Sequence, residues 1–273
     1  MRVGDIPPVA LTIAGSDSSG GAGIQADLKT FSALGVYGMS ALTAITSQNT
    51  VGVSRILVLP PDLVAAQIRD VVTDIGCQAA KTGMLGNAEV TVAVATTVRE
   101  LGLGQLVVDP VMIAKSGDAL LEDEAVEALV EYLLPLAAVL TPNLPEAERL
   151  LGRSIATLED MSAAAAELGE LGPRAVVVKG GHRADQPADV LWQARAPGVE
   201  VLHGPRLPAR STHGTGCVFS AAIAAGLASG MSVPQAVRRA KLFVTEAIRY
   251  GLPLGKGHGP ANVLAAGRML PGS

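Results

Sequence analysis

Cysteine, aromatic residues and long runs of like charge are all scarce in this chain of 273 residues. The two cysteines, Cys77 and Cys217, are too few for a disulfide framework, so we expect a reducing, cytoplasmic compartment. Aromatic residues make up only 3% of the chain. The core must therefore be built from Ala, Val, Leu and Ile, as in parallel sheets that helices cover on both faces.

Neither sign of charge dominates the chain. The net charge is -4, from 21 Lys and Arg against 25 Asp and Glu, which argues against nucleic acid or an anionic membrane surface as the main partner. No apolar stretch approaches the roughly 18 residues that a membrane-spanning helix needs, and the N-terminus does not have the pattern of a signal peptide. We expect a cytoplasmic protein that acts on a small molecule.

Segments that favour strands alternate with segments that favour helices along the whole chain. Strands are predicted at 9–14, 40–46, 54–59, 79–81, 106–109, 137–140, 175–179, 189–193 and 199–202. Helices are predicted at 24–34, 60–73, 88–101, 123–133, 145–151, 158–171, 215–229 and 234–250. With no linker and no repeat, this alternation predicts a single α/β domain over residues 1–273, with a mostly parallel central sheet flanked by helices on both faces.

One glycine-rich stretch has the pattern of an anion site. From Thr212 to Cys217 the sequence reads Thr-His-Gly-Thr-Gly-Cys, and an apolar run rich in helix formers follows. Glycines let the main chain turn tightly, so consecutive N–H groups can point the same way, and a helix that begins here adds its positive end. Phosphate is the expected ligand of this site. The alternative is a glycine-rich loop that only starts a buried helix.

Polar residues fall at the ends of the predicted strands, where open α/β sheets bind their ligands. They are Asp17, Gln48, the run 81–84 (Lys-Thr-Gly-Met), Asp109, Asn143 and Lys179. Together with the stretch at 212–217 they predict a crevice with an anion site at one end.

Each of these residues also has a purely structural interpretation. Asp109, in Val-Val-Asp-Pro, either caps the turn at Pro110 or contacts Mg²⁺ or phosphate. Asn143 either caps a helix, with Glu146 as its capping-box partner, or binds a ligand. Lys179 either meets a negative charge or extends its ammonium to solvent at the sheet rim. The sequence leaves these alternatives open.

Several common enzyme motifs are missing. There is no P-loop, no G-x-S-x-G and no H-E-x-x-H, and the four histidines have no spacing typical of a metal site. Residues 21–26 match the loose dinucleotide pattern G-x-G-x-x-A. However, no Asp or Glu occurs between Asp27 and Asp62, where the acid that binds the ribose is expected. A nicotinamide enzyme is therefore disfavoured.

With these motifs in place, the chain closely resembles the ribokinase-like superfamily, and within it the hydroxymethylpyrimidine and phosphomethylpyrimidine kinases of thiamine biosynthesis. The matching stretches, in the family's order, are residues 14–30, 48–50, 81–85, 108–112, 115–118, 141–147, 179–182 and 212–217. The resemblance implies a kinase that uses ATP and Mg²⁺. Such a kinase phosphorylates 4-amino-5-hydroxymethyl-2-methylpyrimidine on its hydroxymethyl oxygen, and then the monophosphate to the diphosphate.

The resemblance also implies a role for each matching site residue. The amide of Gln48 reads the pyrimidine edge, since it supplies both a donor and an acceptor. The residues implied around the ring are Gly15, Ala22, Asp27, Met84 and Val111. Those implied for ATP are Lys179, Asn143 and Thr212, and those for Mg²⁺ are Asp109 and Glu146. Gly214, Thr215, Gly216 and Cys217 are implied in catalysis. Residues 115–118 and 257–260 are expected to close over the site as loops.

Cys217 stands where the superfamily's sugar kinases usually have an aspartate base, and the pyrimidine branch has cysteine there. The thiol either accepts a proton or only shapes the site while amides and Mg²⁺ stabilise charge. Val218 departs from the threonine that is common in the family, which removes a hydroxyl near the phosphates. The rival predictions are a pyridoxal or pyridoxine kinase and a non-catalytic protein that binds pyrimidine or nucleotide. A homodimer is expected, because dimers are common in the family.

Overall fold

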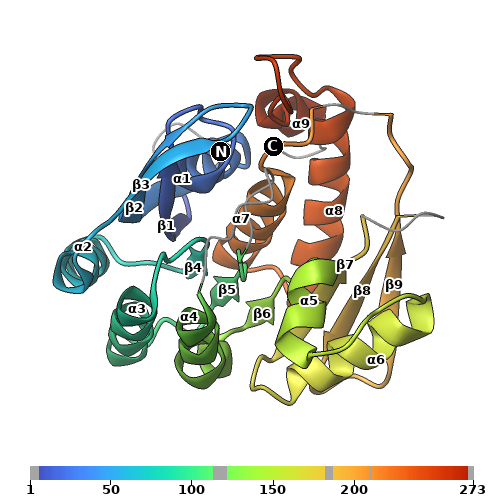
Figure 1. Ribbon diagram of the computed structural model, residues 1–273, viewed down its shortest axis with the longest axis horizontal. Helices are drawn as coiled ribbons and strands as arrows, with labels where there is room; N and C mark the ends of the chain where they lie inside the picture. Colours follow the sequence, from blue (N-terminus) through green and yellow to red (C-terminus); the bar gives the residue numbers. More distant parts are fainter. Residues whose placement is uncertain (1–5, 113–121, 182–186, 209–210, 270–273) are drawn as a thin grey trace.

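The computed structural model describes residues 6–112, 122–181, 187–208 and 211–269 (Figure 1). These residues form a nine-stranded sheet with the order β3-β2-β1-β4-β5-β6-β7-β8-β9. The strands are β1 (Val9–Asp17), β2 (Tyr37–Gln48), β3 (Val53–Val58), β4 (Ala79–Thr82), β5 (Leu106–Val108), β6 (Val139–Leu140), β7 (Ala175–Lys179), β8 (Ala188–Gln193) and β9 (Val199–His203). The sheet contains every strand that the sequence predicts, and β1 and β2 are longer than expected.

The sheet is parallel at its centre and antiparallel at its edges. Strands β2, β1, β4, β5, β6 and β7 pair in parallel. Strand β3 returns antiparallel to β2, and β8 and β9 return antiparallel beyond β7. The mostly parallel sheet is thus confirmed. Since the six parallel strands point the same way, their carboxyl ends lie along one edge, and the residues at or just after these ends come together there.

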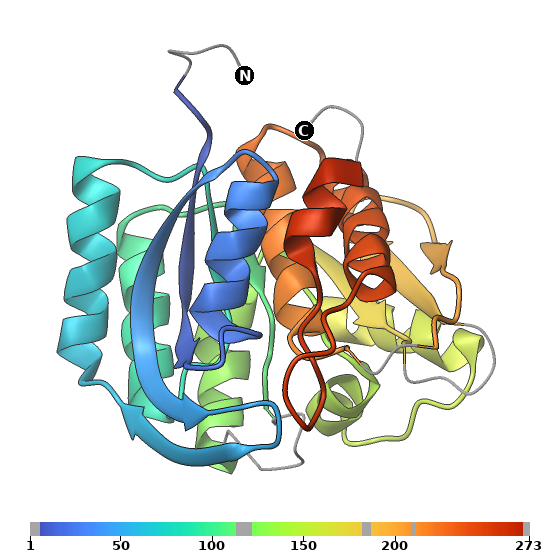
Figure 2. The same cartoon turned by 90° about the horizontal axis from the view of Figure 1, so that it is seen from above.

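Helices cover both faces of this sheet, as predicted. They are α1 (Gly23–Ala33), α2 (Pro61–Asp74), α3 (Ala88–Glu100), α4 (Asp123–Ala128), α5 (Leu144–Leu151), α6 (Leu158–Gly169), α7 (Thr215–Ala228), α8 (Val233–Arg249) and α9 (Val263–Met269). Helices α1, α7, α8 and α9 pack against one another in both views (Figures 1 and 2). None of the helices in the described parts of the chain is long and apolar enough to cross a membrane.

The alternation of side chains along the strands divides the core into two layers. In β1, Leu11 and Ile13 belong to the layer beneath α2, α3 and α6, whereas Ala10 belongs to the layer beneath α1, α7 and α8. Helix α7 is apolar all round, and every residue from Val218 to Ala228 is buried. A helix without a polar face is stable only when it is enclosed, and α7 lies between the sheet and α8. Its N-terminus is thereby fixed relative to the strand ends.

Two helical segments differ from the sequence prediction. The helix expected at 123–133 ends at Ala128, and the chain continues as a π-helical turn (η1, Leu129–Leu133) and a 3-10 turn (η2, Leu134–Leu136) before Ala137. Helix α9 was not predicted. It has only seven residues and buries Val263, Ala266 and Gly267; a Cβ on Gly267 would lie 2.8 Å from the carbonyl oxygen of Ala33. So short a helix gives too few positions for a clear periodic pattern.

Candidate active site

Helix α7 begins in a tight turn at Gly214, which has the left-handed φ of 74°. A Cβ on this residue would overlap the carbonyl oxygen of Gly21 in the loop before α1. The amide of Val218 makes the first helical hydrogen bond, to the Gly214 carbonyl at 2.9 Å. Helix geometry leaves the preceding amides, those of Thr215, Gly216 and Cys217, without acceptors inside the helix. The turn therefore has the geometry of an anion site, called the cradle below (residues 214–217).

An acid and a lysine from neighbouring strand ends lie against the cradle. Nζ of Lys179, at the end of β7, is 2.9 Å from Oδ1 of Asp109, which follows β5. A Cβ on Gly216 would lie 3.5 Å from Nζ of Lys179 and 3.8 Å from Oδ2 of Asp109. Gly216 is 37 residues from Lys179 and 107 residues from Asp109 in the sequence, and the structure brings the three residues together.

The carboxylate of Asp109 is buried and surrounded by donors. Thr141 Oγ1 donates to Oδ1 and Ser220 Oγ donates to Oδ2, each at 3.2 Å. Burial opposes the charged form, but Lys179 and Lys81 outweigh it and lower the pKa of Asp109. For Lys179, burial likewise opposes the charge, while Asp109 and Glu146 raise its pKa. Of the two interpretations of Lys179, the structure therefore agrees with the one in which its ammonium contacts a negative charge.

Asn143 and Glu146 form the capping box of α5. Oδ1 of Asn143 accepts from the Glu146 amide at 2.9 Å, and Oε2 of Glu146 accepts from the Asn143 amide at 2.7 Å. The structural interpretation of this pair is therefore correct. The Asn143 backbone also forms a parallel β-bridge with Lys179, and a ligand role for the Asn143 side chain stays a prediction. Burial raises the pKa of Glu146 to about 7, and Asp109 adds to the rise while Lys179 opposes it.

The charges at this edge fit a cation. Asp109 is held ionised by Lys179 and Lys81, and loss of the proton from Glu146, whose pKa is raised to about 7, adds a second negative charge near Lys179. The described part of the chain holds no cluster of three or more Asp, Glu, His or Cys. Mg²⁺ commonly takes only one or two carboxylates and completes its shell with water and substrate phosphates. The two carboxylates therefore suit Mg²⁺ that arrives with a nucleotide.

A second acid and lysine lie entirely inside the protein. Side chains of Asp27 in α1 and Lys81 in β4 are both 0% exposed, and Lys81 Nζ is 2.9 Å from Asp27 Oδ2. Thr12 Oγ1 donates to the same oxygen at 2.7 Å, whereas Oδ1 of Asp27 is buried without a partner. Burial opposes the Lys81 charge, but Asp27 outweighs it and raises the pKa of Lys81. The structure therefore places Asp27 below the surface, so contact with the ring stays a prediction.

Cys217 lies close to this buried pair and is a free thiol. Burial raises the pKa of Cys217 to about 11, although the cation of Lys81 and a hydrogen bond with the Gly23 backbone oppose the rise. The negative charge of Asp27 adds to it. In the free protein the thiol is therefore protonated near neutral pH, in contrast to the low pKa that a helix N-terminus alone favours.

Two of the residues implied around the ring pack directly on each other. The amide of Gly15 donates to the Met84 carbonyl at 3.1 Å, and a Cβ on Gly15 would lie 2.5 Å from Cε of Met84. Ala22 precedes α1 as its N-cap. Val111 is half-buried, and its amide donates to the Asp109 carbonyl at 2.8 Å. These residues line the strand-end edge from β1 through β4 to the segment after β5.

Gln48 ends β2 and is tied to the loop after β1. Its backbone amide donates to Ser18 Oγ, and that hydroxyl donates to the Gln48 carbonyl, both at 2.8 Å. Its side-chain Oε1 accepts from Thr46 Oγ1 at 3.1 Å. The side-chain amide is half-buried, so its remaining polar groups can meet a ligand.

Of the two loops expected to close over the site, the structure describes only the one at 257–260. Residues 115–118 lie outside the described residues. The loop at 257–260 is held by the turn after β2, since the amides of Gly257 and His258 donate to Thr50 at 3.2 Å. Thr212 precedes the cradle, and its carbonyl accepts from Thr215 Oγ1 at 3.2 Å.

Sequence analysis missed two features of this edge. The buried pair of Asp27 and Lys81 could have been suspected, because a lysine within a four-residue apolar strand needs a partner. The contact of His213 with Asp17 was also missed; the two residues are 196 positions apart, and no pattern in the sequence joins them.

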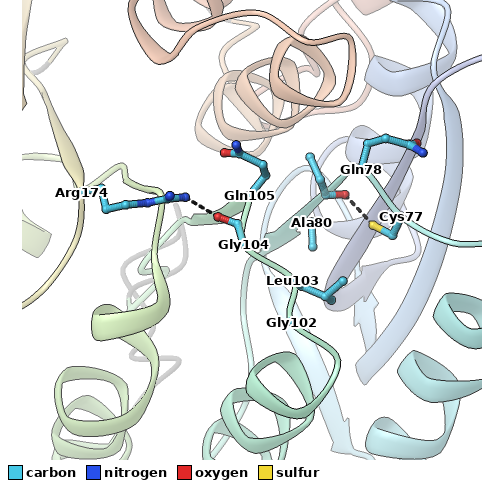
Figure 3. Close-up of a pocket in the computed structure, with 9 residues that line it drawn as sticks. Cys77, Gln78, Ala80, Gly102, Leu103, Gly104, Gln105 and Arg174 are labelled. Atoms are coloured by element: carbon cyan, nitrogen blue, oxygen red, sulfur yellow. Dashed lines mark hydrogen bonds between the residues drawn. The ribbon is translucent and has the colours of Figure 1, made fainter.

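A cavity of about 240 Å³ lies at the opposite edge of the sheet (Figure 3). It is lined by the segments before β4 and β5 and by Arg174, whose guanidinium donates to the Gly104 carbonyl. Sγ of Cys77 donates to the Ala79 carbonyl at 2.8 Å. None of the site residues that the sequence predicts lines this cavity.

The sheet and its helices form a ribokinase-like α/β fold, which solved pyridoxal kinases share with TM-scores of 0.87 to 0.89. The sequence matches the phosphomethylpyrimidine kinase family over residues 17–262, and the chain belongs to this family.

Three relatives show how far the similarity extends. The chain is 52% identical to the hydroxymethylpyrimidine/phosphomethylpyrimidine kinase of Streptomyces coelicolor, over 94% of both chains. It is also 52% identical to the thiamine biosynthesis bifunctional protein of Geobacter sulfurreducens; the match covers 94% of this chain but only 52% of that longer protein. The structure of an ADP complex of Bacillus subtilis pyridoxal kinase superposes with a TM-score of 0.87 at 42% identity, covering 95% of this chain and 98% of the other.

Proposed function

We propose that the protein is an ATP-dependent kinase of thiamine biosynthesis. It phosphorylates 4-amino-5-hydroxymethyl-2-methylpyrimidine on the hydroxymethyl oxygen, and then phosphorylates the monophosphate to the diphosphate. Membership of the phosphomethylpyrimidine kinase family supports this assignment. The observation that carries it is the position of Lys179 and Asp109 against Gly216, which puts cationic and metal-binding groups where the amides of the cradle meet a phosphate.

The proposed mechanism depends on position and charge more than on covalent chemistry. Gln48 reads the pyrimidine edge, and Gly15, Met84, Ala22 and Val111 form the walls around the ring. The cradle amides stabilise the charge on the transferring phosphoryl group, because they are fixed before the reaction by the enclosed helix α7. Lys179, Asn143 and Thr212 hold the ATP phosphates.

Asp109 and Glu146 are the proposed Mg²⁺ ligands, either directly or through water. Bound Mg²⁺ supplies charge neutralisation for the β- and γ-phosphates. The raised pKa of Glu146 means that its carboxyl must lose a proton before it binds a cation. Lys179, which contacts Asp109 and is also influenced by the charge of Glu146, keeps Asp109 ionised in the absence of nucleotide.

The test is turnover with purified protein, ATP and Mg²⁺, and with the pyrimidine alcohol and pyridoxal offered separately. We expect phosphorylation of the pyrimidine alcohol and of its monophosphate. Pyridoxal kinase is the second candidate, since the B. subtilis pyridoxal kinase shares the fold at 42% identity. A much higher kcat/KM for pyridoxal than for the pyrimidine would decide for that candidate. Normal ligand binding without ADP release would indicate a non-catalytic binding protein.

Replacing Gln48 should act on the alcohol rather than on ATP. We expect Gln48→Ala to raise the KM for the pyrimidine by about tenfold or more, because one lost hydrogen-bond pair is worth roughly 1.5–3 kcal/mol, and to leave the KM for ATP nearly unchanged. Steady-state kinetics with each substrate varied in turn measures both constants. Ser54→Ala, which removes an exposed hydroxyl that donates to the Ser47 carbonyl beside Gln48, is the matched control. Equal effects on both KM values would contradict the assignment.

Replacing Cys217 separates its two possible roles. If the thiolate is the general base, Cys217→Ala lowers kcat by about 10²-fold. Because the pKa of the thiol is about 11, wild-type kcat/KM should then rise with pH over the range below that value, and the rise should be absent in the variant. Near-normal turnover in Cys217→Ala with an unchanged pH profile would assign the thiol to shape alone.

We further propose that the protein acts in the cytoplasm as a homodimer, without nucleic acid or membrane as a partner. Ile45 and Leu57 face each other across β2 and β3, and both are exposed, which supports a contact of this edge with a second copy. Light scattering after size-exclusion chromatography measures the mass directly. A single species of 27.7 kDa at micromolar concentration would exclude the dimer.

A further inference from the structure

Asp17 organises the loop that joins β1 to α1. Its Oδ1 accepts from the Ser19 amide at 2.8 Å, and its Oδ2 accepts from the amides of Gly21 and Ala22 at 3.2 and 2.8 Å. Burial opposes its ionisation, but hydrogen bonds from His213, Ser19 and Ala22 lower the pKa of Asp17 to about 2. The loop is therefore folded around a permanent carboxylate.

The same carboxylate reaches the segment that leads into the cradle. Oδ2 of Asp17 is 2.9 Å from Nε2 of His213, and the two side chains are only 3% and 10% exposed. Because a carboxylate only accepts, Nε2 of His213 carries the hydrogen in this contact. His213 is fixed on its other side by the C-terminal loop, since its amide donates to the Gly259 carbonyl at 3.0 Å.

The two loops also touch through their backbones on either side of this contact. A Cβ on Gly21 would overlap Cδ2 of His213, and a Cβ on Gly214 would overlap the Gly21 carbonyl. The two loops are tightly packed against each other. A change in the separation of Asp17 and His213 must therefore move the cradle relative to the loop between β1 and α1.

The residue after Asp17, Ser18, contacts Gln48, which is proposed to bind the pyrimidine edge. Ser18 Oγ exchanges hydrogen bonds with both backbone groups of Gln48 at 2.8 Å. A continuous set of short contacts thus runs from Gln48 through Ser18 and Asp17 to His213, and Gly214 comes next in the chain. This path joins the proposed pyrimidine-binding end of the site to its phosphate-binding end.

We propose that Asp17 and His213 are positioning residues for phosphoryl transfer: their contact sets the distance between the pyrimidine-binding loop and the cradle. This inference rests on the proposed function. In the transfer, the hydroxymethyl oxygen bonds to the γ-phosphorus, the bond from that phosphorus to the bridging oxygen of ADP breaks, and the hydroxyl proton leaves to a base or to solvent. A small misplacement of the alcohol is enough to slow this step by about 10²-fold.

If the contact of Asp17 with His213 positions the alcohol, its loss should increase the hydrolysis of ATP by water. When the alcohol is misplaced while the cradle still holds ATP, water attacks the γ-phosphorus instead, and ADP forms without phosphorylated alcohol. A variant that merely unfolds in part loses both reactions in the same proportion. The ratio of ADP formed to phosphoryl groups transferred to the pyrimidine, with each diphosphate counted as two groups, therefore separates positioning from stability.

The experiment measures this ratio with ATP, Mg²⁺ and the pyrimidine alcohol in wild type, His213→Ala, His213→Gln and Asp17→Asn. We expect a ratio of one for wild type, and a ratio well above one for His213→Ala and Asp17→Asn, with kcat for transfer reduced by about tenfold to a hundredfold. The KM for ATP should change by no more than about twofold. His213→Gln should restore the ratio, because its amide nitrogen can donate from nearly the position of Nε2.

Two controls complete the design. His203→Ala removes an exposed histidine at the end of β9 and should keep the wild-type ratio. The double variant Asp17→Asn/His213→Ala should be close to Asp17→Asn alone, since Asp17→Asn changes the contact with His213 and also the contacts with the loop amides. If His213→Ala does not fold, the ratio is measured with Asp17→Asn instead.

Two results would overturn the inference: a ratio of one in both His213→Ala and Asp17→Asn, or a His213→Gln variant as uncoupled as His213→Ala. Failure of the proposed function would look different. Wild type would then yield no phosphorylated pyrimidine at all, and the same ratio would be measured with pyridoxal as the alcohol.

Discussion

Gly214→Ala is expected to lower kcat by about 10² to 10³-fold while the protein remains folded. The residue holds a left-handed φ of 74°, and a Cβ there would overlap the Gly21 carbonyl. The clash must displace the first turn of α7, whose amides are proposed to meet the transferring phosphate. Loss of one such donor costs an enzyme a factor of this size. Steady-state kinetics at saturating ATP and alcohol measures it.

Gly230→Ala is the matched control for this variant. Gly230 follows the other end of α7 with a φ of 80°, and no atom lies within 4 Å of its added Cβ. Both alanines incur the same left-handed strain, about 1–2 kcal/mol, but only the one at position 214 meets a neighbour. Equal losses of kcat in the two variants would mean that backbone strain, and not the cradle, accounts for the effect.

Lys81→Met should destabilise the protein by about 3–5 kcal/mol, because it leaves the Asp27 carboxylate buried without its cation. The free energy of unfolding in urea measures this effect. Arg69→Met is the matched control: Arg69 is also 2.9 Å from its acid, Glu100, but these side chains are 46% and 54% exposed. That change should cost less than about 1 kcal/mol.

The pH dependence of Lys81→Met follows from the pKa of Asp27. Burial already raises this pKa in the wild type, and Lys81 is the main influence that opposes the rise. Without Lys81 the folded-state pKa moves further above its unfolded value. Stability is then retained below the unfolded pKa of about 4 and is lost as pH rises toward the folded value. A Lys81→Met protein that is equally unstable at pH 5 and pH 8 would contradict this account.

The double variant Lys81→Met/Asp27→Leu tests whether charge or packing is responsible. Removing both partners replaces an ion pair with apolar groups of similar size, so much of the lost stability should return. If the double variant is as unstable as Lys81→Met alone, the loss comes from packing around β4 and not from an unpaired carboxylate.

Much of the architecture could be predicted because it depends on local sequence patterns. The buried strand 175–179 and the helix after Gly214 have clear apolar runs bounded by glycine, and both were found within one or two residues. Helix α4 ended earlier than predicted, since its apolar pattern continues through a π-helical turn that periodicity does not distinguish from an α-helix. Helix α9 was missed because seven residues are too few for a clear periodic pattern.

The candidate site was predictable one residue at a time but not as a set of contacts. Strand order placed Asp109 and Lys179 at the same edge, so their proximity followed from topology. The capping box of Asn143 and Glu146 was one of two alternatives that the sequence left open, and the structure contains it. The contact of Asp17 with His213, by contrast, depends on how two loops fold against each other. Loop packing is fixed by tertiary structure, and a single sequence carries no local signal for it.

The separation of 196 residues between Asp17 and His213 has a consequence for biosynthesis. Strand β1 lies in the middle of the sheet, yet α7, which covers it, is made only after most of the chain has left the ribosome. Until then α1 already covers part of this face, but the parts of β4 and β5 that α7 covers are exposed in the nascent chain. Contacts between such distant segments form slowly. The turn proposed to bind phosphate therefore forms only when synthesis is nearly complete, and a chain released before α7 does not contain it.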